Sequence, residues 1–164
     1  MRVAGAHVRA GLVLALLVAA HFTLRPMLGD SRLTPDFVLV ALLFFAIRVR
    51  PAWGAVAGLL VGIVTDSVSP TAFGAAALAL TIVGYAAGWL KAVVFADNLL
   101  VNALFVFSAA WVRDVIQALV SRQLEGGALA WQLLALSPMA AGATALAAVV
   151  TLVVFRGWLR QAGA

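Results

Sequence analysis

The chain has 164 residues, of which 65% are hydrophobic and only 10% are charged. A soluble domain is closer to half apolar and a quarter charged, so this composition indicates a polytopic helical membrane protein. The net charge of +5 does not indicate a nucleic-acid-binding protein, because the Lys and Arg residues lie mainly in predicted loops and tails rather than in one patch. The absence of cysteine excludes disulfides, thiol catalysis and cysteine metal sites.

Six apolar segments separated by short charged loops predict an all-α bundle of six transmembrane helices, forming a single domain over residues 1–164. The first segment follows Arg2 and Arg9 and resembles a signal peptide with a cleavage site near Ala20, but we interpret it as a retained span. We expect His21, near its outer end, to lie at the membrane interface. The predicted spans are 10–25, 34–48, 52–66, 71–90, 98–120 and 133–155.

The second span is expected to begin with Thr34 as the N-cap, a proline at the first helical position and Asp36 in the first turn. It is short, because residues 33–49 reach roughly 25 Å at ~1.5 Å per residue, against a hydrocarbon thickness of ~30 Å. Arg48 and Arg50 follow it. A re-entrant hairpin would place both arginines inside hydrocarbon, so we reject that alternative.

The third span has a glycine at every fourth position, Gly54, Gly58 and Gly62, and Asp66 follows four residues later. Residues at i and i+4 lie on one face of a helix, so this face is a groove without side chains that ends at a carboxylate. In a membrane, small residues at this spacing allow another helix backbone to approach closely. We interpret the groove as a packing seam, either within the bundle or for a partner helix.

Residues 66–70 are expected to form the turn after this helix, with Ser69 as the N-cap of the next one. Asp66 is then either a loop acid that caps the following helix or a residue that contacts a partner. The helix dipole disfavours a carboxylate at a helix C-terminus, which weakens the purely structural interpretation. The fourth span ends with a second pair of small residues at helical spacing, Gly84 and Gly88, which we assign to the same seam.

The fifth span is interrupted by Arg113 and Asp114. Adjacent residues point about 100° apart around a helix, so these two are not expected to form a facing ion pair. Asp114 shares a polar helix face with Gln117 and Ser121, which either lines the bundle interior or lies at the outer interface. Residues 122–131 are expected to form a loop before the last span, which is rich in alanine.

The distribution of Lys and Arg predicts the orientation in the membrane. With six spans the two termini share a side. That side holds seven basic residues and the other side holds three: Arg2, Arg9, Arg48, Arg50, Lys91, Arg156 and Arg160 against Arg25, Arg32 and Arg122. The positive-inside rule then places both termini in the cytoplasm. It also places Asp36, Asp66 and the polar face of Asp114 toward the external half of the membrane.

An ordered set of features lies between Thr34 and Lys91, and together these features resemble the rod shape-determining protein MreD family. Asp114 looks like a further acidic position of that family. The last span departs from the family pattern, because members often have an Asn and a Pro there and neither follows Pro138. The matching features are Pro35-Asp36, Phe44-Phe45-Ala46-Ile47-Arg48, Gly54, Gly58, Gly62, Asp66, Ser69, Gly74, Gly84-Tyr85 and Gly88.

The resemblance implies a bacterial inner-membrane protein of the elongation machinery that has no cofactor. Such a protein binds the single-span periplasmic protein MreC and thereby joins the actin-like MreB filament to lateral peptidoglycan synthesis. The enzymes of that synthesis are a SEDS-type glycosyltransferase and a penicillin-binding transpeptidase. The family is also similar in fold to the substrate-binding membrane subunits of energy-coupling-factor vitamin transporters, so a transport subunit is the alternative function.

The sequence contains no catalytic constellation and no metal site: there is no P-loop and no HExxH motif, and the two histidines have no partner at ligand spacing. We therefore predict a non-enzymatic scaffold that works by contact within the lipid bilayer. The candidate partner-binding residues are Asp36, Asp66 and Asp114. A vitamin pocket needs several converging polar and aromatic groups, whereas the spans are mostly Ala, Leu and Val. The sequence leaves open whether the protein forms a homodimer and whether Asp66 and Asp114 converge.

Overall fold

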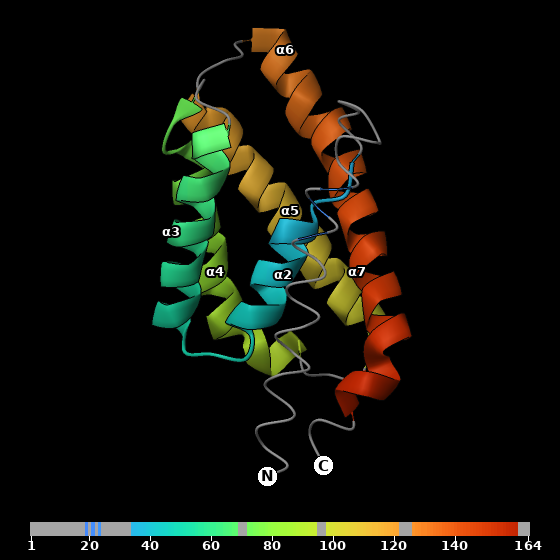
Figure 1. The fold of residues 1–164 in the computed structure, drawn as a ribbon. Helices are drawn as coiled ribbons and strands as arrows, with labels where there is room; N and C mark the ends of the chain where they lie inside the picture. Colours follow the sequence, from blue (N-terminus) through green and yellow to red (C-terminus); the bar gives the residue numbers. More distant parts are fainter. Residues whose placement is uncertain are drawn as a thin grey trace.

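The computed structural model describes residues 19, 21, 23, 34–68, 72–94, 98–121 and 126–160, and this part of the chain is helical apart from short connections (Figure 1). It confirms the prediction of an all-helical protein. The predicted first span falls outside the described residues except for residues 19, 21 and 23. The helices are α2 (Phe37–Ala46), α3 (Pro51–Val68), α4 (Ala75–Val94), α5 (Leu99–Ser121), α6 (Gly126–Trp131) and α7 (Ser137–Arg160), with a π-helical segment η2 (Gln132–Leu136) between the last two.

Three helical stretches are long and apolar enough to cross a membrane, judged by length and composition: Pro51–Val68, Leu99–Ser121 and Gly126–Val154. Two further apolar helices are shorter, Phe37–Ala46 and Ala75–Leu90. Large apolar side chains on α3, α4, α5 and α7 face outward. Such an exterior is unfavourable in water and matches the hydrocarbon of a bilayer.

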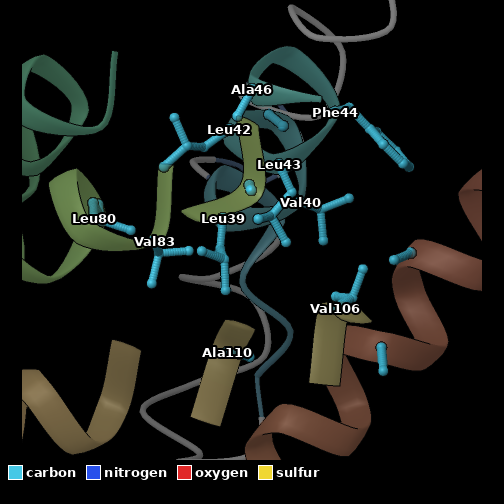
Figure 2. Packing of buried hydrophobic residues seen from close by; sticks show 14 of the residues in the cluster. Leu39, Val40, Leu42, Leu43, Phe44, Ala46, Leu80, Val83, Val106 and Ala110 are labelled. Carbon is cyan, nitrogen blue, oxygen red and sulfur yellow. The ribbon is translucent and has the colours of Figure 1, made fainter. Parts of the chain in front are cut away.

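The short helix α2 forms the centre of the bundle and contacts α3, α4, α5 and α7. Its sequence is apolar on all sides, which is typical of a fully buried helix. Leu39 and Leu43 are among the most deeply buried side chains of the protein. Figure 2 shows Leu39 beside Val83 of α4, and Val106 and Ala110 of α5 belong to the same cluster. The hydrophobic core therefore joins segments from most of the chain around one ten-residue helix.

The start of α2 differs from the prediction, because the N-cap is Asp36 and not Thr34. The Oδ1 atom of Asp36 accepts a hydrogen bond from the backbone N–H of Leu39 at 3.0 Å. Thr34 and the proline after it precede the helix. Aspartate is a somewhat better N-cap than threonine, so the helix begins where the stronger cap stands.

The ends of two other elements also differ from the predictions. Helix α3 continues through Asp66 to Val68, so the turn predicted over residues 66–70 begins later, and Ser69 lies outside the described residues. Helix α4 begins at Ala75 after Gly74, whose φ of +96° is a left-handed conformation that glycine adopts readily.

The loop predicted over residues 122–131 is wrong for its second half. Residues 126–131 form helix α6, which continues through η2 into α7 without a break. Gly126 has a φ of +58°, so the glycine pair at 126 and 127 marks the beginning of a helix rather than a loop that extends to Trp131. The last helical stretch is consequently longer than the predicted span.

The π-helical segment η2 has a side-chain partner on α5. The indole Nε1–H of Trp111 donates a hydrogen bond to the backbone carbonyl of Leu133 at 3.1 Å. We expect Trp111→Phe to lower the free energy of unfolding by about 1 kcal/mol, because the carbonyl loses this donor. Denaturation of the full chain in mixed micelles measures the change. Trp131→Phe is the matched control, because Trp131 is also exposed and the hydrogen bond to Leu133 comes from Trp111. Equal stability of the two variants would show that this hydrogen bond contributes nothing.

Candidate functional site

Helices α3 and α4 lie side by side and antiparallel, with their backbones in close contact along the glycines of α3 (Figure 1). Gly54 lies against Gly84, Gly58 against Leu80 and Gly62 against Ala77. A Cβ atom added to Gly58 would lie 2.6 Å from the carbonyl carbon of Leu80, closer than Cβ contacts in real proteins. Only glycine allows α4 to lie at this distance from α3.

The second pair of glycines takes part in the same contact from the α4 side. A Cβ atom on Gly84 would lie 3.0 Å from the carbonyl carbon of Gly54, and one on Gly88 would lie 2.7 Å from the Cα of Pro51. The glycine-lined face of α3 is therefore occupied by α4 of the same chain. The sequence left open whether the groove packs against a helix of the bundle or against a partner helix. The structure shows a helix of the bundle in it.

Asp66 stands at the end of this seam and binds the first turn of α4. Its carboxylate accepts hydrogen bonds from the backbone N–H groups of Gly74 (3.0 Å), Ala76 (3.1 Å) and Ala77 (2.9 Å), and the residue is only 3% exposed. The first N–H groups of a helix have no partner within the helix, and its positive dipole end favours an anion. The start of α4 thus offsets the unfavourable position of Asp66 near the C-terminus of α3.

We expect Asp66→Ala to lower the free energy of unfolding by about 3 kcal/mol, because three buried or partly buried N–H groups lose their acceptor. Asp66→Asn keeps one acceptor oxygen, so its free energy of unfolding should lie between those of the wild type and Asp66→Ala. Ser67→Ala is the control, because Ser67 is exposed and its hydroxyl bonds only to Ile63 of its own helix in the described structure. The measurement is again unfolding in mixed micelles, and an Asp66→Ala variant as stable as Ser67→Ala would contradict the capping role.

A second polar site, which we call the arginine clasp, lies where the start of α2 meets α5 and α7. It consists of Asp36, Arg113, Asp114 and Thr144. The Nη1 atom of Arg113 lies 2.8 Å from Oδ2 of Asp36 and 3.3 Å from Oδ1 of Asp114. The expectation that Arg113 and Asp114 do not pair is therefore wrong. The two residues leave the helix in different directions, but the long arginine side chain brings its guanidinium to both carboxylates.

Helix α7 is attached to the arginine clasp by a hydroxyl group. The backbone N–H of Asp36 donates to Oγ1 of Thr144 at 3.1 Å, and Thr144 itself donates to the carbonyl of Ala140 at 3.0 Å. Ser137, at the start of α7, is also buried. Three helices are thus joined at one point by polar groups within an otherwise apolar bundle.

His21 also belongs to this region, since its Nδ1 atom lies 3.6 Å from Oδ1 of Asp36 and its side chain is buried. His21 is thus buried within the protein beside Asp36, and its position at the membrane interface stays a prediction. Sequence reasoning did not assign roles to Arg113 and Thr144. Each is a polar residue inside a long apolar segment. Such residues rarely face lipid, so this pattern could have indicated that both lie inside the bundle.

The structure brings Asp36 and Asp114 together through Arg113, and it places Asp66 at the start of α4 instead. All three acids therefore bind groups of their own chain. Among the described residues, no group of three or more His, Cys, Asp or Glu side chains is placed to hold a metal ion. These contacts hold the helices together, and the charged side chains of the arginine clasp pair with one another.

A family model for the rod shape-determining protein MreD matches residues 7–156, nearly the whole chain. The chain belongs to the MreD family. The match confirms the resemblance seen between Thr34 and Lys91 and extends it through the last span, despite the absence of the Asn and Pro noted there. No curated protein and no solved structure matches the chain significantly.

Membership of the MreD family makes this a membrane protein that determines cell shape, in agreement with the apolar exterior of the helices. It also places the chain in the context of the rod-shape elongation complex. Asp36 and Asp66, the two acids on which the resemblance partly depends, act in this structure as helix caps. What remains for contact with other molecules is the outer surface.

Proposed function

We propose that this member of the MreD family is a non-enzymatic scaffold of the elongation complex in the bacterial inner membrane. It binds MreC and thereby connects MreB filaments to lateral peptidoglycan synthesis by a SEDS-type glycosyltransferase and a penicillin-binding transpeptidase. Family membership supports the place in the complex. We further propose six spans with both termini in the cytoplasm, which the seven-to-three distribution of basic residues supports.

The observation that carries a contact-only function is the use of the polar groups within the bundle. Asp66 is engaged by three backbone N–H groups of α4, and Arg113 is engaged by two carboxylates. A hydrolytic or transfer reaction needs an acid, base or nucleophile directed at a substrate. In this chain these polar groups stabilise its own helices instead. This use favours a rigid protein that binds its partners through its apolar exterior.

The test is site-specific photocrosslinking in cells that express MreC. A photoreactive amino acid is placed at one exposed apolar position on each of four helices: Leu60 of α3, Ile82 of α4, Leu104 of α5 and Leu146 of α7. We expect crosslinks to MreC from positions on one side of the bundle. Leu43, which is buried in α2, is the control position and should give none. Absence of MreC crosslinks at all four exposed positions would contradict the proposal.

A thermal-shift screen with vitamins distinguishes the scaffold from a transport subunit. A scaffold should show no saturable shift of its unfolding temperature. A saturable shift at micromolar vitamin would favour transport, because a ligand that binds only the folded state stabilises it.

A further inference from the structure

Two arginines without acidic partners lie at the end of the bundle where α2 is joined to α3. Arg48 and Arg50 are both exposed in the connection between these helices, which we call the α2–α3 turn. Within the part of the chain that the structure describes, neither arginine takes part in an ion pair. The acids of that part bind other groups: Asp36, Asp66 and Asp114. The α2–α3 turn therefore carries two positive charges without a counter-ion from the described chain.

The guanidinium groups of both arginines can still bind an anion. Arg48 donates one side-chain hydrogen bond, to the backbone carbonyl of Phe44, and Arg50 donates none within the described structure. An arginine presents several N–H donors in a planar fork that fits the oxygens of a phosphate. The backbone of the turn is held by its own hydrogen bonds. The N–H of Arg48 donates to the carbonyl of Phe45 at 2.9 Å, and the carbonyl of Arg50 accepts from the N–H of Trp53 at 2.9 Å.

Two exposed tryptophans belong to the same end of the bundle. Trp53, in the first turn of α3, is 62% exposed, and Trp89 of α4 is 73% exposed. The residue before Trp89 touches the turn: a Cβ atom on Gly88 would lie 2.7 Å from the Cα of Pro51 and 3.4 Å from the carbonyl oxygen of Ala46. Figure 1 shows the α2–α3 turn, the start of α3 and the end of α4 together at the lower end of the bundle. Tryptophan favours the membrane interface, so this end lies at the depth of the lipid headgroups.

The charge and the position of the α2–α3 turn together identify the class of ligand. The helices that leave this end have apolar outward faces, with Leu60 of α3 and Ile82 of α4 exposed. The arginines therefore lie where the lipid-facing surface ends. A phosphate forms charge-assisted and often bidentate hydrogen bonds with a guanidinium. An acidic protein segment has the same charge, but a phospholipid also covers the apolar faces beside the turn, so the lipid fits both features.

We propose that the α2–α3 turn binds the headgroup phosphate of an anionic phospholipid. Arg48 and Arg50 bind the phosphate, and the acyl chains follow the outward face of the α3–α4 pair. The indoles of Trp53 and Trp89 lie at the border between the two. A basic residue near a membrane surface strengthens the binding of anionic lipid about fivefold. This inference does not depend on which protein the scaffold binds or on which side of the membrane the turn lies.

The test measures relative lipid binding from the quenching of tryptophan fluorescence, with the full chain reconstituted in vesicles. Phosphatidylglycerol is compared with phosphatidylcholine, and both carry brominated oleoyl chains. The reporter variant keeps only Trp53 and Trp89, and its other tryptophans are replaced by phenylalanine. It therefore reports on lipid beside the α2–α3 turn.

Two double substitutions are made in the reporter variant. The test variant is Arg48→Gln with Arg50→Gln, which removes the two guanidinium groups of the turn. The matched control is Arg156→Gln with Arg160→Gln, which removes two positive charges near the end of α7 and leaves the turn intact. The control separates binding at the turn from a general effect of the net charge of the protein.

We expect phosphatidylglycerol to bind roughly five- to thirtyfold more strongly than phosphatidylcholine in the reporter and in the control, and about equally in the test variant. Equal binding of the two lipids in the reporter would overturn the proposal and leave the arginines to another anion, such as an acidic protein segment. An equal loss of preference in the test variant and in the control would also overturn it, because the preference would then come from net charge.

Thermal unfolding in dodecylmaltoside micelles provides a second measurement and distinguishes a lipid from free phosphate. Added phosphatidylglycerol should raise the unfolding temperature of the chain with intact arginines more than that of the test variant, each compared with itself before addition. Inorganic phosphate at the same concentration should not do so. A shift with inorganic phosphate as large as that with phosphatidylglycerol would overturn the assignment to lipid. Equal shifts with phosphatidylglycerol in both proteins would overturn the role of the arginines.

Discussion

Gly58→Ala should lower the free energy of unfolding by roughly 1–3 kcal/mol, although the change adds a single methyl group. The added Cβ would lie 2.6 Å from the carbonyl carbon of Leu80 and 3.0 Å from the Cα of Thr81, both atoms of the α4 backbone. A flexible side chain could move aside, but a helix backbone moves only as a unit. Separation of α3 and α4 would also weaken the hydrogen bonds of Asp66 to the first turn of α4.

Gly142→Ala is the matched control on α7. Gly142 is also in a helix, but nothing lies within 4 Å of the position that its Cβ would occupy. Alanine is the better helix former by about 1 kcal/mol, so this variant should be as stable as the wild type or slightly more stable. Denaturation in mixed detergent micelles compares the two. If Gly58→Ala were as stable as Gly142→Ala, α3 and α4 would not be in backbone contact at Gly58.

Arg113→Met should lower the free energy of unfolding by about 3 kcal/mol, because it leaves the partly buried Asp36 and Asp114 near each other without a cation. The neutral triple variant, Arg113→Met with Asp36→Asn and Asp114→Asn, should recover a large part of this loss. Arg50→Met is the control for loss of a positive charge. Arg50 is exposed before α3, and this variant should stay within ~0.5 kcal/mol of the wild type.

A double-mutant cycle between Arg113→Met and Asp36→Asn measures the interaction across the arginine clasp. Residues in one ion-pair network show coupling of about 0.5–3 kcal/mol, whereas distant sites are additive. We expect coupling in this range. Strict additivity, together with a loss for Arg113→Met no larger than for Arg50→Met, would show that the guanidinium does not hold α2 against α5.

The α3–α4 seam could be anticipated in part from the sequence because its signal is local. Glycines at every fourth position define a bare face from α3 alone, and Gly84 and Gly88 do the same on α4. Which helix occupies the bare face depends on the tertiary arrangement. The sequence therefore indicated a seam and left its occupant open, and the structure places α4 there.

The arginine clasp could not be anticipated because its members are far apart in the chain and each has a plausible local role. Asp36 and Thr144, which are joined by a hydrogen bond, are 108 positions apart. The expectation for Arg113 and Asp114 used Cβ directions only, and a side chain with four rotatable bonds is not limited to that direction. The misplaced end of α3 has a similar cause: Asp66 is tolerated near a C-terminus only because the start of α4 supplies its N–H donors.

The interior and the exterior of this protein therefore have separate roles in the proposed scaffold. The glycine seam and the arginine clasp fix the helices, and the outward apolar surface is left for lipid and for other proteins of the elongation complex. Interior substitutions should affect cell shape only by reducing the amount of folded protein. Substitutions on the surface that meets MreC should affect cell shape while the protein stays folded.

The most direct test of this division is the amount of MreC that co-purifies per folded molecule. The wild type is compared with Gly58→Ala, Arg113→Met and substitutions at the crosslinking positions Leu60, Ile82, Leu104 and Leu146. We predict that MreC per folded molecule stays unchanged in the two interior variants and falls for surface variants on one side of the bundle. Failure of the folded wild type to retain MreC would contradict the scaffold function, as would retention that is unchanged in every surface variant.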